Sequence, residues 1–167
     1  MSAIYASQCR LEIVRILWKE QKRDLHETRC MIDIKILGIG DESALESFLI
    51  PLVDSSMFLI GNMRAAGLVD KGEIYQGAYA AAFEHGKIIG VVAHFWNDNV
   101  LSQAPKRHVN ALWRAAVAKS GRPVRGIIGP DAQVKTVKQA MALKDSQIRL
   151  DETEGLYSLT MSQLIDL

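Results

Sequence analysis

The sequence predicts a mixed α/β domain that begins near Met31, with a mostly antiparallel central sheet flanked by helices. Residues 75–101 show the alternation of an antiparallel meander of three strands. Residues 109–117 carry the clearest helical stripe of the chain, and a strand at 124–128 follows it. A meander combined with strands that are linked by helices is typical of a mixed α/β (α+β) sheet.

Length and composition favour one principal domain. The chain has 167 residues, of which 49% are hydrophobic and 23% charged, as in globular rather than disordered or fibrous proteins. Cys9 and Cys30 have no neighbouring Cys or His at a metal-ligand spacing, which argues against a zinc site and a disulfide framework. We therefore divide the chain into an N-terminal helical extension, residues 1–30, and a domain, residues 31–167.

The sequence shows neither a membrane span nor a signal peptide. The apolar run Ile88–Trp96 is shorter than the roughly 18 residues that a span needs. Glu12, Arg15 and Lys19 interrupt the only apolar region near the N-terminus. We expect a cytoplasmic protein without a membrane partner.

The extension is predicted to contain an amphipathic helix at residues 8–23. Its apolar stripe is Cys9, Ile13, Ile16 and Leu17. Isolated helices of this length are marginally stable in water, so we expect this stripe to pack on the domain or on a second copy.

The domain is predicted to open with a strand and two helices. Isoleucines alternate with charged residues from Met31 to Ile36, as in a half-buried strand. Ser43 and Glu46 suggest a capping box for a short helix. A second helix is expected from about Ser56 to a C-terminal cap at Gly67.

The meander follows these helices. One strand ends at Phe83, and Glu84–Lys87 supplies turn residues before the strand Ile88–Trp96. Residues 97–99 turn the chain again into a strand at Val100–Leu101.

Helices and strands alternate in the remainder. The helix with the stripe from Val109 to Val117 ends at Ser120–Gly121, and the strand Val124–Ile128 leads to a helix that starts at Gly129–Pro130. Two short strands, Gln147–Leu150 and Leu156–Met161, complete the prediction. We expect the strands at Val100 and Val124 to lie adjacent and splayed.

This order and four local stretches resemble the GNAT superfamily of acyl-CoA-dependent N-acetyltransferases. The stretches are FLIGNMRAAGL (58–68), GVVAHFWNDNVLSQAP (90–105), IIGPDAQVKTVKQAMAL (127–143) and EGLYSLTMSQL (154–164). They look like the N-terminal half of two-domain GNAT proteins, and the resemblance covers Met31–Leu167.

The resemblance implies a degenerate GNAT half that works with a second half carrying the acetyl-CoA site. It implies acetyl-CoA as cofactor and a small amine or a protein amine as acceptor, with a second GNAT half or a second copy of the chain as partner. The chain would then supply one half of a substrate cleft or a weak acyl-CoA site. The alternative is a non-catalytic binding or dimerisation module with the same fold.

The cofactor-binding candidates are Gln103, Lys106, Arg107 and His108. Catalytic GNAT domains hold the CoA pyrophosphate with a Q/R-x-x-G-x-G/A loop, in which glycines let backbone N–H groups approach phosphates at a helix N-terminus. Aligned on Gln103, this chain has Lys106 and His108 at the glycine positions, and Pro105 lacks an amide donor. Side-chain charge could replace part of that cradle, because residues 99–130 contain six basic residues and no acidic one.

No catalytic residue is assigned. GNAT enzymes usually have a tyrosine acid on the helix after the fifth strand, and residues 131–143 contain none. Tyr157 is interpreted as a packing residue, His94 as a core histidine and Glu84 as part of a turn. The histidines lack metal-ligand spacing, and Trp113 lies on the buried helical stripe, so we expect neither a metal nor a nucleic-acid partner.

Overall fold

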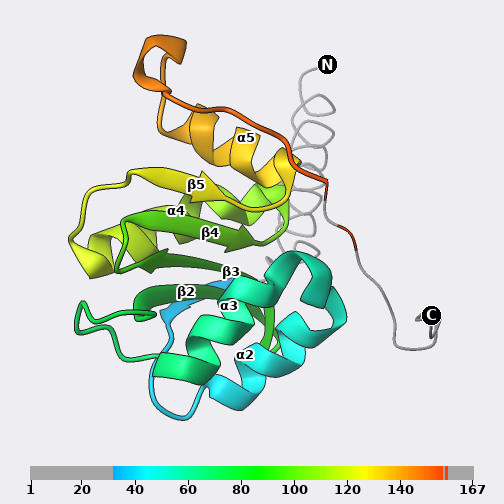
Figure 1. Ribbon diagram of the computed structural model, residues 1–167. Helices are drawn as coiled ribbons and strands as arrows, with labels where there is room; N and C mark the ends of the chain where they lie inside the picture. Colours follow the sequence, from blue (N-terminus) through cyan, green and yellow to red (C-terminus); the bar gives the residue numbers. More distant parts are fainter. Residues whose placement is uncertain (1–31, 156, 158–167) are drawn as a thin grey trace, which may run out of the picture. The chain divides into compact units, whose positions relative to one another are not determined.

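The computed structural model describes residues 32–155 and 157, which belong to one compact unit. At its centre lies a five-stranded sheet in the order β1-β2-β3-β4-β5 (Figure 1). The strands are β1 (Asp33–Ile36), β2 (Gly77–Glu84), β3 (Lys87–Phe95), β4 (Asn99–Gln103) and β5 (Gly126–Ile128). The first four strands pair antiparallel, whereas β4 and β5 pair parallel. The predicted mixed, mostly antiparallel sheet is thus confirmed.

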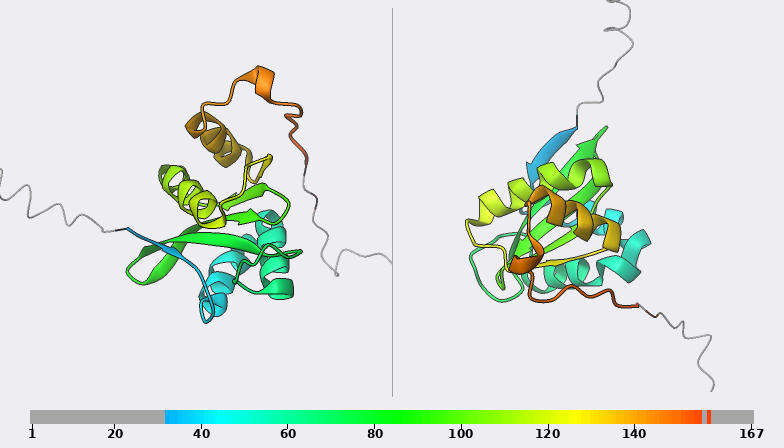
Figure 2. Two further views of the ribbon diagram at one scale, coloured as in Figure 1. Left: turned by 90° about the vertical axis from the view of Figure 1, so that its left-hand side faces the viewer. Right: turned by 90° about the horizontal axis from the view of Figure 1, so that it is seen from above.

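Helices cover both faces of the sheet (Figure 2). They are α2 (Glu42–Leu49), η1 (Ile50–Leu52), α3 (Val53–Ala66), α4 (Lys106–Ser120), α5 (Asp131–Ala140) and η2 (Asp145–Gln147). Alternate strand residues point to opposite faces and form two separate cores. Tyr79 and Leu101 pack with Leu59 of α3, whereas Val100 packs with Val109 of α4.

The β2–β3 hairpin has the predicted turn. His85 and Gly86 have φ of 50° and 74°, as expected at the two central positions of a type I′ turn. This turn type has the twist of the flanking strands, so residues 84–87 fix the register of the two longest strands.

The beginning of α2 differs from the prediction. Ser43 and Glu46 form no capping box, because the helix already starts at Glu42. The Asp41 carboxylate instead accepts hydrogen bonds from Lys35 Nζ (2.7 Å) and the amide of Gly38 (2.9 Å). These contacts, the lysine bond first, hold the pKa of Asp41 below its usual value.

The second predicted helix starts earlier than expected. The chain stays helical through η1, and α3 begins at Val53 rather than near Ser56. Pro51 is tolerated because it lies in the first turn of η1. Gly67 ends α3 at the predicted position with a positive φ of 71°, but its ψ of −163° differs from the left-handed helical cap that was expected.

The continuous helical stretch Glu42–Ala66 bears on the expectation that the chain has no membrane span. Among the described residues, it is the one helical stretch that is long and apolar enough, by length and composition alone, to cross a membrane. Core helices pass the same test, so this is weak evidence for a span. Leu45, Leu49 and Leu59 of the stretch are buried in the core on one face of the sheet.

The predicted strand at Gln147–Leu150 is wrong. Residues 145–147 form η2, where the Gln147 side chain accepts a hydrogen bond from the amide of Lys144 (3.0 Å). Lys138 Nζ also binds the Asp151 carboxylate at 2.7 Å, which holds this segment against α5 instead of the sheet. The helix predicted at residues 8–23 lies outside the described residues, as does the strand predicted at 156–161 apart from Tyr157.

Candidate functional site at the start of α4

The last two residues of β4 extend beyond its parallel pairing with β5. Asn99 to Leu101 pair with Gly126 to Ile128, and β4 then continues to Gln103. The adjacency predicted for these two strands is confirmed. Ser102 is 1% exposed, and its hydroxyl has no hydrogen-bond partner among the described residues.

The first turn of α4 follows directly and carries positive potential. Pro105 is the N-cap, and the amide of His108 donates to the Pro105 carbonyl at 2.8 Å. Within the described part of the chain, the amides of Lys106 and Arg107 donate no hydrogen bond, as expected in a first helical turn. Both side chains are exposed, and the helix dipole adds to their charge. This combination suits an anion.

Gln103 lies apart from these cations. It follows Leu101 on the sheet face that α3 covers, and its Oε1 accepts a hydrogen bond from Ser55 Oγ at 3.0 Å. Gln103 is 9% exposed. The structure therefore does not bring Gln103 together with Lys106 and Arg107, and its assignment to the cofactor stays a prediction.

His108 contributes a hydrogen-bond acceptor. The ring is 8% exposed, and its Nε2 accepts a hydrogen bond from Arg107 Nε at 2.8 Å. Burial lowers the pKa of His108, and the Arg107 charge lowers it further against an opposing effect of Glu84. Because Nε2 accepts this bond, the ring is neutral and orients the Arg107 guanidinium rather than adding charge, and the assignment of His108 to the cofactor stays a prediction.

Two residues of the following segment contact the end of β4: Gln133, which was not identified from the sequence, and Gly129, which was predicted only to begin a helix. Gln133 of α5 accepts a hydrogen bond from the amide of Ala104 through its Oε1 at 2.8 Å. Gly129 packs so closely on β4 that an added Cβ would lie 2.8 Å from Ser102 Oγ. Only the placement of α5 reveals these contacts, because nothing in the local sequence distinguishes Gln133 from other surface glutamines.

These contacts limit which part of acetyl-CoA the residues fit. The amides of Ala104 and His108 are already bonded, and Pro105 has none. The amides of Lys106 and Arg107 remain, together with two exposed side-chain charges. The site fits an anionic group through charge and lacks the glycine cradle.

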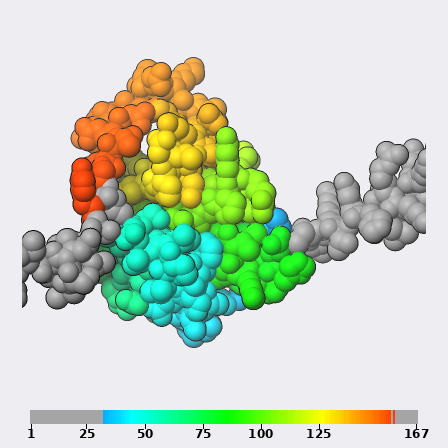
Figure 3. All heavy atoms as spheres, turned by 90° about the vertical axis from the view of Figure 1, so that its right-hand side faces the viewer, coloured from blue at the N-terminus to red at the C-terminus, as the bar shows by residue number. Residues whose placement is uncertain are grey.

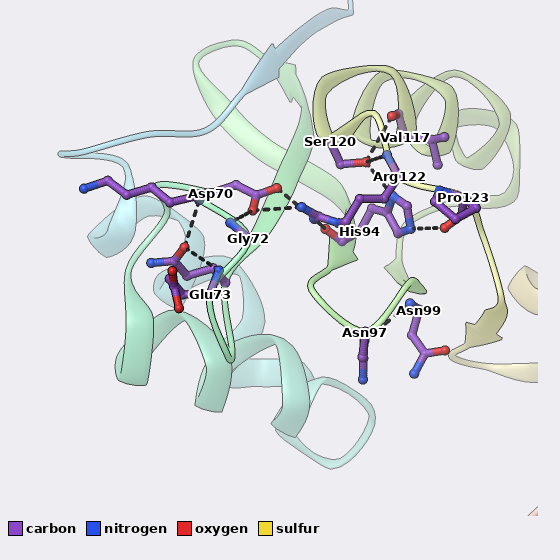
Figure 4. Close-up of polar contacts among 12 residues, drawn as sticks. Asp70, Gly72, Glu73, His94, Asn97, Asn99, Val117, Ser120, Arg122 and Pro123 are labelled. Carbon is purple, nitrogen blue, oxygen red and sulfur yellow. Dashed lines mark hydrogen bonds and ion pairs between the residues drawn. The ribbon is translucent and has the colours of Figure 1, made fainter.

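A second polar cluster lies at the other end of α4 (Figure 4). His94 of β3 is fully buried, and its Nε2 lies 3.1 Å from the Pro123 carbonyl, so this nitrogen carries the proton. Its Nδ1 then accepts from the Ser120 hydroxyl at 2.6 Å. Burial lowers the pKa of His94, and the nearby Arg122 charge acts in the same direction. The predicted core role of His94 is confirmed.

Arg122 holds this cluster together. Its guanidinium donates two hydrogen bonds to the Asp70 carboxylate, at 3.1 and 2.8 Å, and one to the His94 carbonyl at 2.9 Å. The contacts join the loop after α3 to the loop after α4 across the end of β3 (Figure 4). Because His94 is inaccessible, we interpret the cluster as structural and assign it no role as a base.

Three other residues considered from the sequence have clear positions. Glu84 is the last residue of β2, next to the hairpin turn as expected. Trp113 is partly buried against the α4 core, which agrees with its predicted stripe. Tyr157 is 94% exposed, so its expected packing role is wrong. The reason is that the segment leading to it does not join the sheet.

The described residues offer few other sites. In this part of the chain, no three His, Cys, Asp or Glu side chains are placed to hold a metal ion. Two open hollows lie around α5 and η2, lined by residues of 135–151, and neither includes the first turn of α4.

Comparison with known proteins gives little additional information. No protein-family model matches the sequence, and no curated protein is significantly similar to it. A solved structure described as "a possible acetyltransferase from Clostridium difficile 630" aligns with 75% of this chain and 99% of its own, at 12% identity and a TM-score of 0.44. This likeness is too distant to carry an argument about function. The α+β fold itself rests on the sheet and helices described above.

Proposed function

We propose that this chain is a GNAT-like acetyltransferase domain that binds the anionic part of acetyl-CoA at the first turn of α4. One observation carries the proposal. Lys106 and Arg107 are exposed on a helix start whose amides can donate further hydrogen bonds, at the point where β4 has passed its last pair with β5. The sequence resemblance to GNAT proteins supplies the class of ligand.

The same geometry supports a proposal of binding, and not of the whole reaction, for this chain. Acetyl transfer needs a base for the acceptor amine and a donor to the developing oxyanion. His94 and His108 are both buried, and His108 Nε2 accepts a hydrogen bond from Arg107 Nε. We therefore propose that the catalytic groups and the acceptor, a small amine or a protein amine, depend on a second GNAT half. Cytoplasmic localisation belongs to the same proposal.

Titration of CoA into the protein tests this. Lys106→Ala with Arg107→Ala removes two cations from the first turn, whereas Arg114→Ala with Lys119→Ala removes two from later turns of the same helix. We expect binding to weaken in the first variant and to change little in the matched control. The difference should shrink from about 0.01 M to about 0.15 M salt, because the Debye length falls from about 30 Å to about 8 Å.

Two outcomes contradict the proposal. Equal affinities in the two double variants would remove Lys106 and Arg107 from the site. Absence of heat at millimolar acetyl-CoA would favour the second candidate, a non-catalytic binding or dimerisation module. The contact of Gln133 with the Ala104 amide favours this second candidate, since it occupies a donor at the proposed site.

A further inference from the structure

The outer face of η1 and α3 exposes an unusual number of large apolar side chains. Figure 3 shows α2 and the beginning of α3, in cyan, on the outside of the molecule. The exposed apolar residues, with their exposed fractions, are Ile50 (45%), Leu52 (37%), Val53 (47%), Met57 (47%) and Phe58 (61%). Single exposed apolar residues are ordinary, whereas a contiguous group marks an interaction surface.

Along α3 these side chains continue into a ridge that changes from large to small. Val53, Met57, Gly61 and Ala65 follow one another at spacings of four residues, which places them on a single ridge of the helix. All four are exposed, and the space in front of Gly61 is open, with no atom within 4 Å of an added Cβ. The ridge thus has large side chains in its first half and a shallow depression in its second.

This ridge is complementary to itself in the antiparallel direction. A second copy reversed about residue 59 brings Met57 opposite the partner's Gly61, and Val53 opposite the partner's Ala65. Ridges spaced by four residues interdigitate when two helices cross at about −50°, the commonest helix packing in globular proteins. In a parallel arrangement, by contrast, large residues would meet large ones.

Charge favours the same direction. Asp54 and Arg64 are both exposed on α3, and they lie five residues before and after residue 59. Reversal brings Asp54 of one copy to the level of the partner's Arg64, whereas a parallel pair would bring like charges together. Arg64 Nε already donates to Glu46 at 2.7 Å, but a guanidinium has five N–H donors and this exposed pair is weak.

We propose that α3 forms a two-fold symmetric homodimer interface, in which two copies of the ridge pack antiparallel. Such an interface uses the same surface on both subunits, so that one self-complementary helix face is sufficient. The proposal is independent of acetyl-CoA binding and goes beyond the function proposed above.

Sedimentation velocity of the full-length chain over a range of concentrations tests the apolar part. We expect a monomer–dimer equilibrium whose Kd rises about tenfold or more with Met57→Glu, at the centre of the interface. Gly61→Leu should weaken the dimer similarly by filling the depression, and the open space at Gly61 lets the monomer fold. Leu150→Glu is the control, because Leu150 is 70% exposed but lies outside α3. Circular dichroism verifies the fold of each variant.

A charge exchange tests the direction. Asp54→Arg and Arg64→Asp should each weaken dimerisation, and the double variant should restore it, because only an antiparallel pair brings these positions together. A chain that stays monomeric at all concentrations, or a dimer insensitive to both sets of variants, overturns the proposal. Monomeric protein that binds anionic phospholipid vesicles through Met57 would also overturn it and assign the face to a lipid surface.

Discussion

An arginine and a histidine lie at each end of α4, but the arginine is exposed at the start of the helix and bonded to a carboxylate at the end. At the start, Lys106 and Arg107 are exposed and the first-turn amides have donors to spare. At the end, the Ser120 hydroxyl bonds His94, and the terminal nitrogens of Arg122 bond the Asp70 carboxylate and the His94 carbonyl. The exposed start of α4 is therefore the end with capacity for an anion, whereas the bonded groups at the other end join two loops of the protein.

Arg107 and Arg122 illustrate this difference between the two ends of α4. Arg107 contacts a neutral ring through one nitrogen, whereas Arg122 forms a bidentate pair with a carboxylate whose side chain is only 8% exposed. The terminal nitrogens of Arg122 are bonded within the protein, whereas the Arg107 side chain is exposed. The predictions below test this division, in order of decreasing expected effect.

Removal of Arg122 should have the largest effect on stability. Arg122→Ala removes the charged partner of the Asp70 carboxylate, which keeps its hydrogen bond from the Gly72 amide at 3.1 Å, and breaking this partly buried ion pair should cost up to about 3 kcal/mol. The free energy of unfolding in urea measures this. Arg125→Ala is the matched control, because the Arg125 side chain is 76% exposed in its pair with Asp98 and should contribute less than about 1 kcal/mol. Equal losses in both variants would contradict a structural role for the cluster.

Acid should destabilise the protein through its buried histidines. Burial, followed by the Arg122 charge, lowers the folded-state pKa of His94, so below about pH 6.5 the unfolded chain binds a proton that the folded chain does not. The contribution of neutral His94 to the free energy of unfolding is therefore fully present above that pH, and it is lost as the pH decreases towards the folded-state pKa. The slope is up to about 1.4 kcal/mol per pH unit for each such histidine.

Unfolding measured between pH 7.5 and pH 5 checks this prediction. His94→Gln should flatten the pH dependence of the free energy of unfolding, even though the variant is less stable overall. His108→Gln should flatten it as well, because burial lowers that pKa too. An unchanged slope in both variants would show that other groups cause the acid sensitivity.

The hydrogen bond between Gln133 and the Ala104 amide allows a test at the start of α4. Gln133→Ala leaves the Ala104 amide without its acceptor, which should cost about 1 kcal/mol. If an anion uses this end of β4, the released donor should also raise affinity for CoA. Gln139→Ala, an exposed glutamine on the same helix, should change neither quantity.

The smallest stability effect is expected at the start of α4. Lys106→Ala with Arg107→Ala should change the free energy of unfolding by about 0.5 kcal/mol or less, because both side chains are exposed. A large loss would mean that these cations stabilise the fold, which would weaken the division between the two ends.

The sequence predicted those elements whose local pattern and packing agree. The β2–β3 hairpin combines alternating residues with turn residues at His85–Gly86, and α4 combines a stripe with a Gly121 cap, so both were predicted correctly. The strand expected at Gln147–Leu150 failed because its pattern carried no information about Lys138, which binds Asp151 from another element.

The candidate site was predictable in charge but not in geometry. Lys106 and Arg107 could be identified because they lie in a segment without acidic residues. Gln103 could not be placed, since one residue of strand alternation decides which sheet face it joins, and it joins that of Ser55. Asp70 and Arg122 are 52 residues apart, and no local signal relates them.

The edges of the sheet bear on how readily folded copies can pair edge to edge. In the described residues β5 is only three residues long, which offers a short template for another strand. At the opposite edge, β1 presents exposed Asp33 and Lys35, whose charges disfavour pairing with a strand of another chain. Folded copies would therefore meet poor templates for open-ended edge-to-edge growth, whereas the pairing through α3 proposed above would stop at a closed dimer.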